Sequence, residues 1–221
     1  DEERQLFRRL AVFAGAFDLE AVAAVAGDSD RGTAADLLGR LVDKSLIVHQ
    51  RGPLSSWRLL ETVRAFAAEQ LHSQAESAEA RHRHLLWAAR RAADLETRIG
   101  GQWRDEFDRV ADDLRAALAS CPPGRDESSH RLARALGHLT FARRFLMESL
   151  GHYEQAAARA PDPALAAQDL SDAAGCAHFI HFSGEHAFKL LIAAAEHAAA
   201  AGDGNLQAAV LARAVEIAAR Y

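Results

Sequence analysis

The sequence is poor in cysteine and in positive charge, and it contains no long hydrophobic run. Two cysteines, Cys121 and Cys176, occur among 221 residues, too few and too far apart for the disulfide framework of a small secreted protein. No apolar stretch approaches the roughly 20 residues that a membrane-spanning helix requires. Residues 1–10 also lack the features of a signal peptide. We therefore expect a cytoplasmic protein without membrane contact.

The charge balance excludes a strongly basic protein. Lysine and arginine total 26 against 31 acidic residues, a net charge of −5, so no overall positive field attracts nucleic acid or anionic lipid. A hydrophobic fraction of 49% excludes general disorder and suffices for one large domain or two small ones. Asp1 is no initiator methionine and Tyr221 falls within a helical pattern, so we expect a piece of a longer protein.

Three helices are predicted near the amino terminus. The first is indicated by apolar residues at helical spacing: Leu6, Leu10, Phe13 and Phe17. Gly15 is predicted to cap it. A second helix is predicted over residues 19–26, between an N-cap at Asp18 and a stop at Gly27. A third begins at Thr33 and carries one apolar stripe: Leu37, Leu38, Leu41 and Val42.

The period then changes to that of strands. Residues 45–49 and 57–60 read as a β-hairpin around a turn at residues 51–53. A fourth helix is predicted over residues 62–72, with four inward side chains: Val63, Phe66, Ala67 and Leu71. Three helices, a hairpin and a closing helix form a winged-helix arrangement, which we assign to residues 1–76.

The remainder, residues 77–221, is predicted to be purely helical. Glycine and proline separate candidate helices at residues 80–99, 103–119, 129–145, 148–159, 163–182, 186–201 and 205–221. Short turns between helices of this length indicate stacked antiparallel hairpins. The best single unit, residues 165–201, fits the tetratricopeptide pattern through small and aromatic residues: Ala174, Gly175, Phe179 and Phe182. The predicted fold is mainly α, a winged-helix domain followed by a tetratricopeptide-like array of helical hairpins.

Several phrases resemble one family of bacterial regulators. Residues 6–22, 37–48 and 57–71 (LFRRLAVFAGAFDLEAV, LLGRLVDKSLIV and WRLLETVRAFAAEQL) resemble the region that follows the nucleotide-binding domain in signal-transducing (STAND) NTPases with an NB-ARC module. Such modules occur in LuxR-type and SARP-type transcription activators. Residues 102–118 (QWRDEFDRVADDLRAAL) resemble the family's spacer helix before its tetratricopeptide array. Beyond Pro122 the similarity is one of architecture only.

The resemblance implies a regulatory role without catalysis. In such proteins the winged helix packs against the nucleotide-binding domain and helps to hold its ADP-bound state, and the repeats sense a protein or small-molecule inducer. A separate domain binds DNA. No G-x-x-x-x-G-K-[ST] phosphate loop occurs in these 221 residues, so ATP or ADP is expected only in a missing upstream domain. No G-x-S-x-G or other nucleophile arrangement indicates an enzyme.

The junction between the second strand and the fourth helix is the predicted switch. Family members with a Met-His-Asp motif bring its histidine to the β-phosphate, whereas this chain has Leu59-Leu60-Glu61, which keeps only a carboxylate. The resemblance implies an interdomain role for Arg58, Leu60, Glu61 and Thr62. The alternative is ordinary helix-start chemistry, with Glu61 and Thr62 near free amide donors.

A histidine-rich segment is the predicted partner-binding site of the array. Cys176, His178, His181 and His186 fall within eleven residues, and His178 and His181 are three apart on one helical face, as zinc ligands can be. An aromatic groove with exposed imidazoles explains the pattern equally well. We therefore predict no metal site and assign partner binding to His178, His181, Phe182 and His186.

Direct DNA binding is not favoured. Arginines lie around the third helix and the wing, but aspartates alternate with them: Arg31, Arg40, Arg51 and Arg58 against Asp28, Asp30, Asp36 and Asp43. A helix that reads DNA is expected to carry net positive charge and polar base readers. We predict that the winged helix restrains an adjacent NTPase switch. The alternatives are a winged helix that contacts DNA and a freestanding interaction scaffold.

Overall fold

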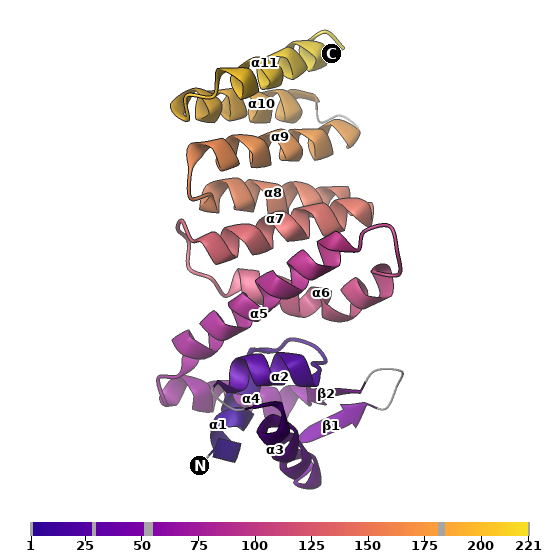
Figure 1. Cartoon of the computed structure of the whole chain (residues 1–221), viewed down its shortest axis with the longest axis vertical. Helices are drawn as coiled ribbons and strands as arrows, with labels where there is room; N and C mark the ends of the chain where they lie inside the picture. Colours follow the sequence, from indigo (N-terminus) through magenta and orange to yellow (C-terminus); the bar gives the residue numbers. More distant parts are fainter. Residues whose placement is uncertain (1, 28–29, 51–54, 181–183, 221) are drawn as a thin grey trace. The chain divides into compact units, whose positions relative to one another are not determined.

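The computed structural model describes residues 2–27, 30–50, 55–180 and 184–220 (Figure 1). The chain divides into two compact units, residues 1–91 with 104–121 and residues 92–103 with 122–221. This division falls within a helix after Arg91, whereas the domain boundary predicted at residues 76 and 77 falls in the preceding turn. The predicted fold class is confirmed, because a winged-helix domain precedes an array of helices.

The first unit contains the winged helix and two further helices. Its winged-helix elements are α1 (Glu2–Arg9), the 3-10 turn η1 (Leu10–Val12), α2 (Leu19–Ala26), α3 (Arg31–Asp43), β1 (Ile47–Gln50), β2 (Ser56–Leu59) and α4 (Glu61–Ser73). Most of α5 (Ser77–Thr97) and all of α6 (Arg104–Ala119) complete the unit. The order of three helices, hairpin and closing helix is the one that the sequence predicts.

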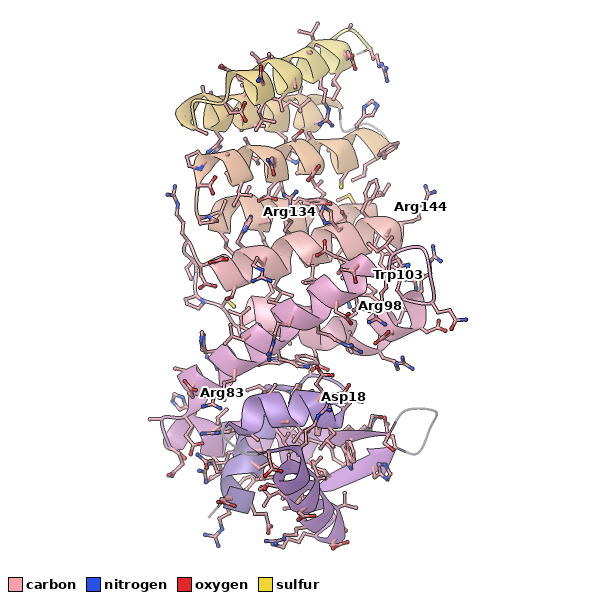
Figure 2. The ribbon with its side chains drawn as sticks, in the orientation of Figure 1. Asp18, Arg83, Arg98, Trp103, Arg134 and Arg144 are labelled. Carbon is pink, nitrogen blue, oxygen red and sulfur yellow. The ribbon has the colours of Figure 1, made fainter. Side chains whose placement is uncertain are left out.

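Aspartate N-caps set the starts of α2 and α3. The carboxylate of Asp18, labelled in Figure 2, accepts a hydrogen bond of 2.8 Å from the backbone N–H of Ala21. The prediction for α2 is therefore confirmed at this end. Asp30 caps α3 in the same way, so that helix begins at Arg31, earlier than the predicted start at Thr33.

The first helix is shorter than predicted. α1 ends at Arg9 and a single 3-10 turn continues to Val12, so the helical prediction is wrong from Phe13 to Phe17. The backbone of Phe13 is extended, yet both phenylalanines are buried. The rings of Phe13 and Phe17 are thus buried from a loop, and their spacing of four residues looks helical although no helix is present there. Gly15 is not a helix cap, because the preceding 3-10 turn ends at Val12. Its N–H donates instead to the carboxylate of Asp113 on α6.

The wing is a two-stranded antiparallel hairpin in which Ile47 faces Leu59. The predicted strands are displaced by one or two residues, and the turn predicted at residues 51–53 lies outside the described residues. Phe17 adds a backbone bridge beside β2, since its N–H and C=O each pair with Trp57 at 2.8 Å. This bridge holds the hairpin against the helical core.

The closing helix exposes a residue that the sequence placed inside. α4 buries Ala67 and Leu71, as predicted. Phe66 is 54% exposed, so its assignment to the core is wrong. The side chain projects about 100° around the helix from Ala67, and its ring lies 6.4 Å from that of Phe7, measured between centroids.

The second unit is a series of antiparallel helices (Figure 1). It contains the end of α5 together with α7 (Glu127–Ala142), α8 (Leu146–Arg159), α9 (Pro163–Phe179), α10 (Gly184–Ala200) and α11 (Gly204–Ala218). Each helix packs against the next along the chain. Three of them begin at capping aspartates: Asp126, Asp162 and Asp203. Among the described residues, no helix has the length and apolar character that crossing a lipid bilayer demands.

α7 and α8 approach closely at a glycine. A Cβ atom at Gly137 would lie 2.9 Å from the ring of Tyr153. The hydroxyl of Ser149 donates to the Gly137 carbonyl at 2.8 Å, which joins the two helices at the same point. Glycine at position 137 therefore sets the spacing of this hairpin.

Candidate functional site

The solvent face of α3 carries no net charge. Its exposed residues are Arg31, Gly32, Ala35, Asp36, Gly39, Arg40 and Asp43, two arginines against two aspartates. The opposite face buries Leu37, Leu38 and Leu41 in the core. The exposed face therefore offers neither the positive charge nor the asparagine or glutamine side chains that read base edges.

The described part of the wing presents little to a ligand. His49 and Trp57 face each other across the hairpin and stack at 5.2 Å, and both are partly buried. Val48 and Arg58 are exposed. The predicted wing arginine Arg51 lies outside the described residues.

The four predicted switch residues lie at the junction of β2 and α4. Arg58, Leu60, Glu61 and Thr62 are all exposed, and Leu60 occupies the N-cap position without a side-chain hydrogen bond. The Glu61 carboxylate accepts a hydrogen bond of 2.7 Å from Arg64. A carboxylate in the first helical turn also stabilises the helix dipole. The switch role of these residues stays a prediction.

An apolar groove adjoins this junction, and we call it the α1–α4 groove. It has a volume of about 320 Å³ and is lined by Arg4, Phe7, Arg8, Phe66 and Gln70. Thr62, Phe66 and Gln70 are spaced four apart, so they share one face of α4 and connect the groove to the switch residues. Sequence reasoning missed the groove because it placed Phe66 in the core.

A network of charged side chains holds one wall of the groove. Arg8 and Arg9 of α1 both pair with the carboxylate of Glu76, in the turn between α4 and α5. Arg9 also donates to the backbone carbonyl of Ala26, at the end of α2. These partly buried arginines fix α1 against its neighbours and thereby position the groove.

A buried carboxylate links α6 to the loop between η1 and α2. Asp113 is 1% exposed and accepts hydrogen bonds from the backbone N–H groups of Ala14 at 2.6 Å and Gly15 at 3.2 Å. Burial raises the pKa of Asp113 to about 6, despite the lowering effect of these two donors. No partner reaches its Oδ2 atom among the residues that the structure describes.

A buried histidine lies in the aromatic core of the same unit. The ring of His84 is 4.9 Å from that of Phe13 and 5.6 Å from that of Trp87. Burial lowers the pKa of His84 to about 4, so the imidazole is neutral at pH 7. Asp113 and His84 therefore both lie in the packed interior of the unit.

The structure separates the histidines predicted to bind a partner. His178 lies 3.5 Å from Arg220, just after α11, whereas His186 pairs with Glu154 of α8 at 3.1 Å. Cys176 is buried. The other two residues of the prediction, His181 and Phe182, lie outside the described residues. Within the described ranges, no group of three histidine, cysteine or acidic side chains is placed to hold a metal ion.

Exposed large apolar side chains, three of them aromatic, lie near the ends of α7 and α9. We define the aromatic edge as Phe141, Phe145, Met147 and Phe179, whose exposed fractions are 39%, 42%, 67% and 65%. The prediction named Phe179 as a packing residue between hairpins and did not single out the other three. Phe141 and Phe145 flank two arginines, which is the sequence signal that would have revealed the edge.

Comparison with known proteins agrees with the winged helix. Residues 1–72 match the family model described as a winged helix-turn-helix domain. The chain is also 41% identical over 162 residues to proteins named "putative HTH-type transcriptional regulator" in Mycobacterium bovis and Mycobacterium tuberculosis. An uncharacterized protein of Mycobacterium bovis is 42% identical over 91 residues, which cover 38% of this chain and 23% of that protein.

The chain corresponds to a small part of these regulators. The alignment covers 69% of this chain but 18% of each regulator, so the chain spans less than a fifth of their length. No solved structure matches the chain.

Proposed function

We propose that this chain is a non-catalytic regulatory part of a bacterial transcription regulator. Its winged helix restrains an adjacent NTPase switch by protein contact, and its helical array senses a protein or small-molecule inducer. The similarity to HTH-type regulators supports the regulatory class. The resemblance of residues 6–22, 37–48 and 57–71 to STAND regulators supports the switch.

One observation carries the proposal. The face of α3 that would enter a DNA groove is electrically balanced, whereas the α1–α4 groove beside the switch residues exposes apolar side chains. Protein–DNA affinity comes largely from positive side chains on phosphates, which this face does not supply in excess. The winged helix is therefore better suited to contact another protein domain.

The α1–α4 groove has the properties of a docking surface. Phe66 is 54% exposed and Leu60 is 42% exposed, so a docked domain would remove the remaining apolar surface of both side chains from water, which favours association. Arg4 and Arg8 also line the groove, and the pairing of Arg8 with Glu76 fixes the α1 side of it. ATP or ADP would bind to that domain, because this chain has no phosphate loop.

Regulation in this scheme is conformational. An inducer on the array releases the docked state only to the extent that it binds the released state more tightly. Glu61 is exposed at the start of α4, where it can face the docked domain. The inducer and the regulated pathway are properties of the longer protein.

The first test is the coding sequence immediately upstream of Asp1. The proposal predicts a glycine-rich phosphate loop followed by a strand that ends in acidic residues. If neither is encoded there, the winged helix has no NTPase switch to restrain. The freestanding scaffold would then be the better account.

The description of the matched family favours a second candidate, direct DNA binding by residues 1–72. A fluorescence anisotropy titration with duplex DNA at low salt separates the two. We expect no saturable binding. Tight binding that weakens with salt, and that Arg40→Glu abolishes while Arg131→Glu of α7 does not, would establish the DNA-binding candidate.

A further inference from the structure

We infer that the aromatic edge of the array binds an acidic peptide segment of a partner protein, in which bulky apolar side chains alternate with carboxylates. This inference rests on the proposed sensing function and names the partner's chemistry. It is carried by three features of the second unit: clustered exposed rings, a local excess of arginine and a hollow of limited size.

The exposed rings form one surface. α7 and α9 run in the same direction, so their last turns lie at the same side of the unit (Figure 1). The rings of Phe141 and Phe179 are 6.2 Å apart at these ends. Phe145 and Met147 extend the surface to the start of α8. A cluster of large apolar side chains in water marks an interaction site more strongly than scattered ones do.

Arginines surround these rings. Within residues 141–148 and the lining of the hollow between α9 and α11, four arginines (Arg143, Arg144, Arg213 and Arg220) stand against two acids, Glu148 and Glu216. This local excess contrasts with the net charge of −5 of the whole chain. Arg144 projects outward at the end of α7 (Figure 2). Carboxylates of a partner would complement this rim.

The arginines and rings also act together. The guanidinium carbon of Arg143 lies 5.3 Å from the centre of the Phe145 ring, a cation–π arrangement. This contact places a positive charge directly beside an exposed ring. This arrangement favours a ligand that carries acidic and apolar groups in close succession.

The neighbouring hollow favours a peptide over a small metabolite. It lies between α9 and α11, has a volume of about 190 Å³ and includes Phe179, Ile217, Arg213 and Arg220 in its lining. Pockets for small molecules are larger, about 300–1,000 Å³. A hollow of this size accepts one apolar side chain of an extended segment, while the arginines meet the flanking carboxylates.

Helix-dipole compensation does not account for the whole surface. Arg143 and Arg220 lie at the carboxyl ends of α7 and α11, where positive charge is favourable in any helix. That effect explains two arginines. It does not explain why Phe179 is 65% exposed and Met147 is 67% exposed beside them.

The test is selection from three displayed libraries of peptides of about twelve residues, with the whole chain as bait. One library combines Asp and Glu with Phe, Leu and Ile, the second replaces the acids by Lys and Arg, and the third replaces the apolar residues by Ser. We expect enrichment from the first library only. The Kd of an enriched peptide is then measured by fluorescence anisotropy with variant chains.

The variants are chosen to stay folded. Phe179→Ser and Arg144→Asn should each weaken binding about tenfold. Both variants should fold, because Phe179 is exposed and asparagine tolerates the positive φ of 67° at Arg144. Phe188→Ser on α10 and Arg131→Asn on α7 are matched controls at exposed positions. They should change the Kd less than twofold.

Three results would overturn the inference: enrichment of basic or serine peptides, no enrichment from the acidic apolar library, or equal losses in the edge and control variants. Self-association of the chain that Phe179→Ser abolishes, measured by sedimentation, would show a second copy as the occupant instead. The selection involves no nucleotide-binding domain. Its failure therefore leaves the proposed restraint of the NTPase switch intact, and failure of that restraint leaves peptide binding intact.

Discussion

Asp113 makes the stability of the first unit depend on pH. Its pKa rises from 3.8 to about 6 on folding, so the folded state holds the proton more tightly between these values. Its contribution to stability is complete below pH 3.8 and is lost as the pH rises through 6. In Asp113→Asn the loss is absent, so the variant's free energy of unfolding relative to the parent should rise by about 3 kcal/mol from pH 4 to 7.

Urea denaturation at a series of pH values measures this difference. Asp105→Asn is the control for net charge, because Asp105 is exposed on the same helix and is not among the groups that shift the pKa of Asp113. A difference between Asp113→Asn and the parent that does not change with pH would contradict the account.

His84 has the opposite effect in the same pH range. Its pKa falls from 6.5 to about 4 on folding, so the unfolded state takes up the proton first as the pH decreases. The stability that the neutral ring provides is present above pH 6.5 and is lost towards pH 4. His84→Phe keeps a ring against Phe13 and Trp87, and it should lose about 3 kcal/mol less than the parent on acidification from pH 7 to 4.

Thermal unfolding monitored by circular dichroism checks this prediction, with the exposed His82→Gln of the same helix as the control. The control should follow the parent at every pH. Parallel curves for His84→Phe and the parent would show that the imidazole does not titrate between the two states.

At single residues, the sequence predicts local interactions better than distant ones. The cap at Asp18 depends on an amide three residues away and is readable directly. The N–H of Gly15 pairs with Asp113, 98 residues away, which no local pattern records. Phe66 falls on the inner side by periodicity, but the period cannot say whether a neighbouring element covers it.

At the scale of elements, the contact between α7 and α8 depends on Gly137. In Gly137→Ala the new methyl group would lie 2.9 Å from the Tyr153 ring, so the hairpin must open or the ring must move. Despite the higher helix propensity of alanine, we expect a loss of about 1–3 kcal/mol. Gly151→Ala on α8 is the matched control, since its new methyl group meets nothing within 4 Å. It should be neutral or stabilising by up to about 1 kcal/mol.

Chemical denaturation of the two alanine variants gives the comparison directly. Equal stability of Gly137→Ala and Gly151→Ala would show that the close approach of α7 and α8 does not limit the hairpin.

The helical hairpins are predictable from the sequence, and a second unit besides residues 165–201 carries the repeat spacing. The tetratricopeptide spacing occurs at Leu136, Gly137, Ser149, Tyr153 and Pro161. Alanine at the tryptophan position (Ala133), threonine at the tyrosine position (Thr140) and serine at the usual alanine position (Ser149) hide this match. The alanine-rich sequences of α9 and α10 favour residues 165–201, because small residues also permit close packing.

At the scale of the whole molecule, the proposed function requires a nucleotide-binding domain outside these 221 residues. The chain spans less than a fifth of the regulators that it resembles, so its surfaces are the best guide to its partners. Charge balance on α3 was predictable by counting residues. The α1–α4 groove and the aromatic edge were not, because each requires side chains from different helices to be exposed together.

The most direct measurement is the rate of ADP release from the full-length protein that contains this chain. A fluorescent ADP analogue would be followed in the parent, in Phe66→Ser and in the control Phe188→Ser on α10. If the winged helix restrains the switch through the α1–α4 groove, Phe66→Ser should speed release about tenfold and the control should not. Unchanged release in Phe66→Ser and in Leu60→Ser would contradict the central claim.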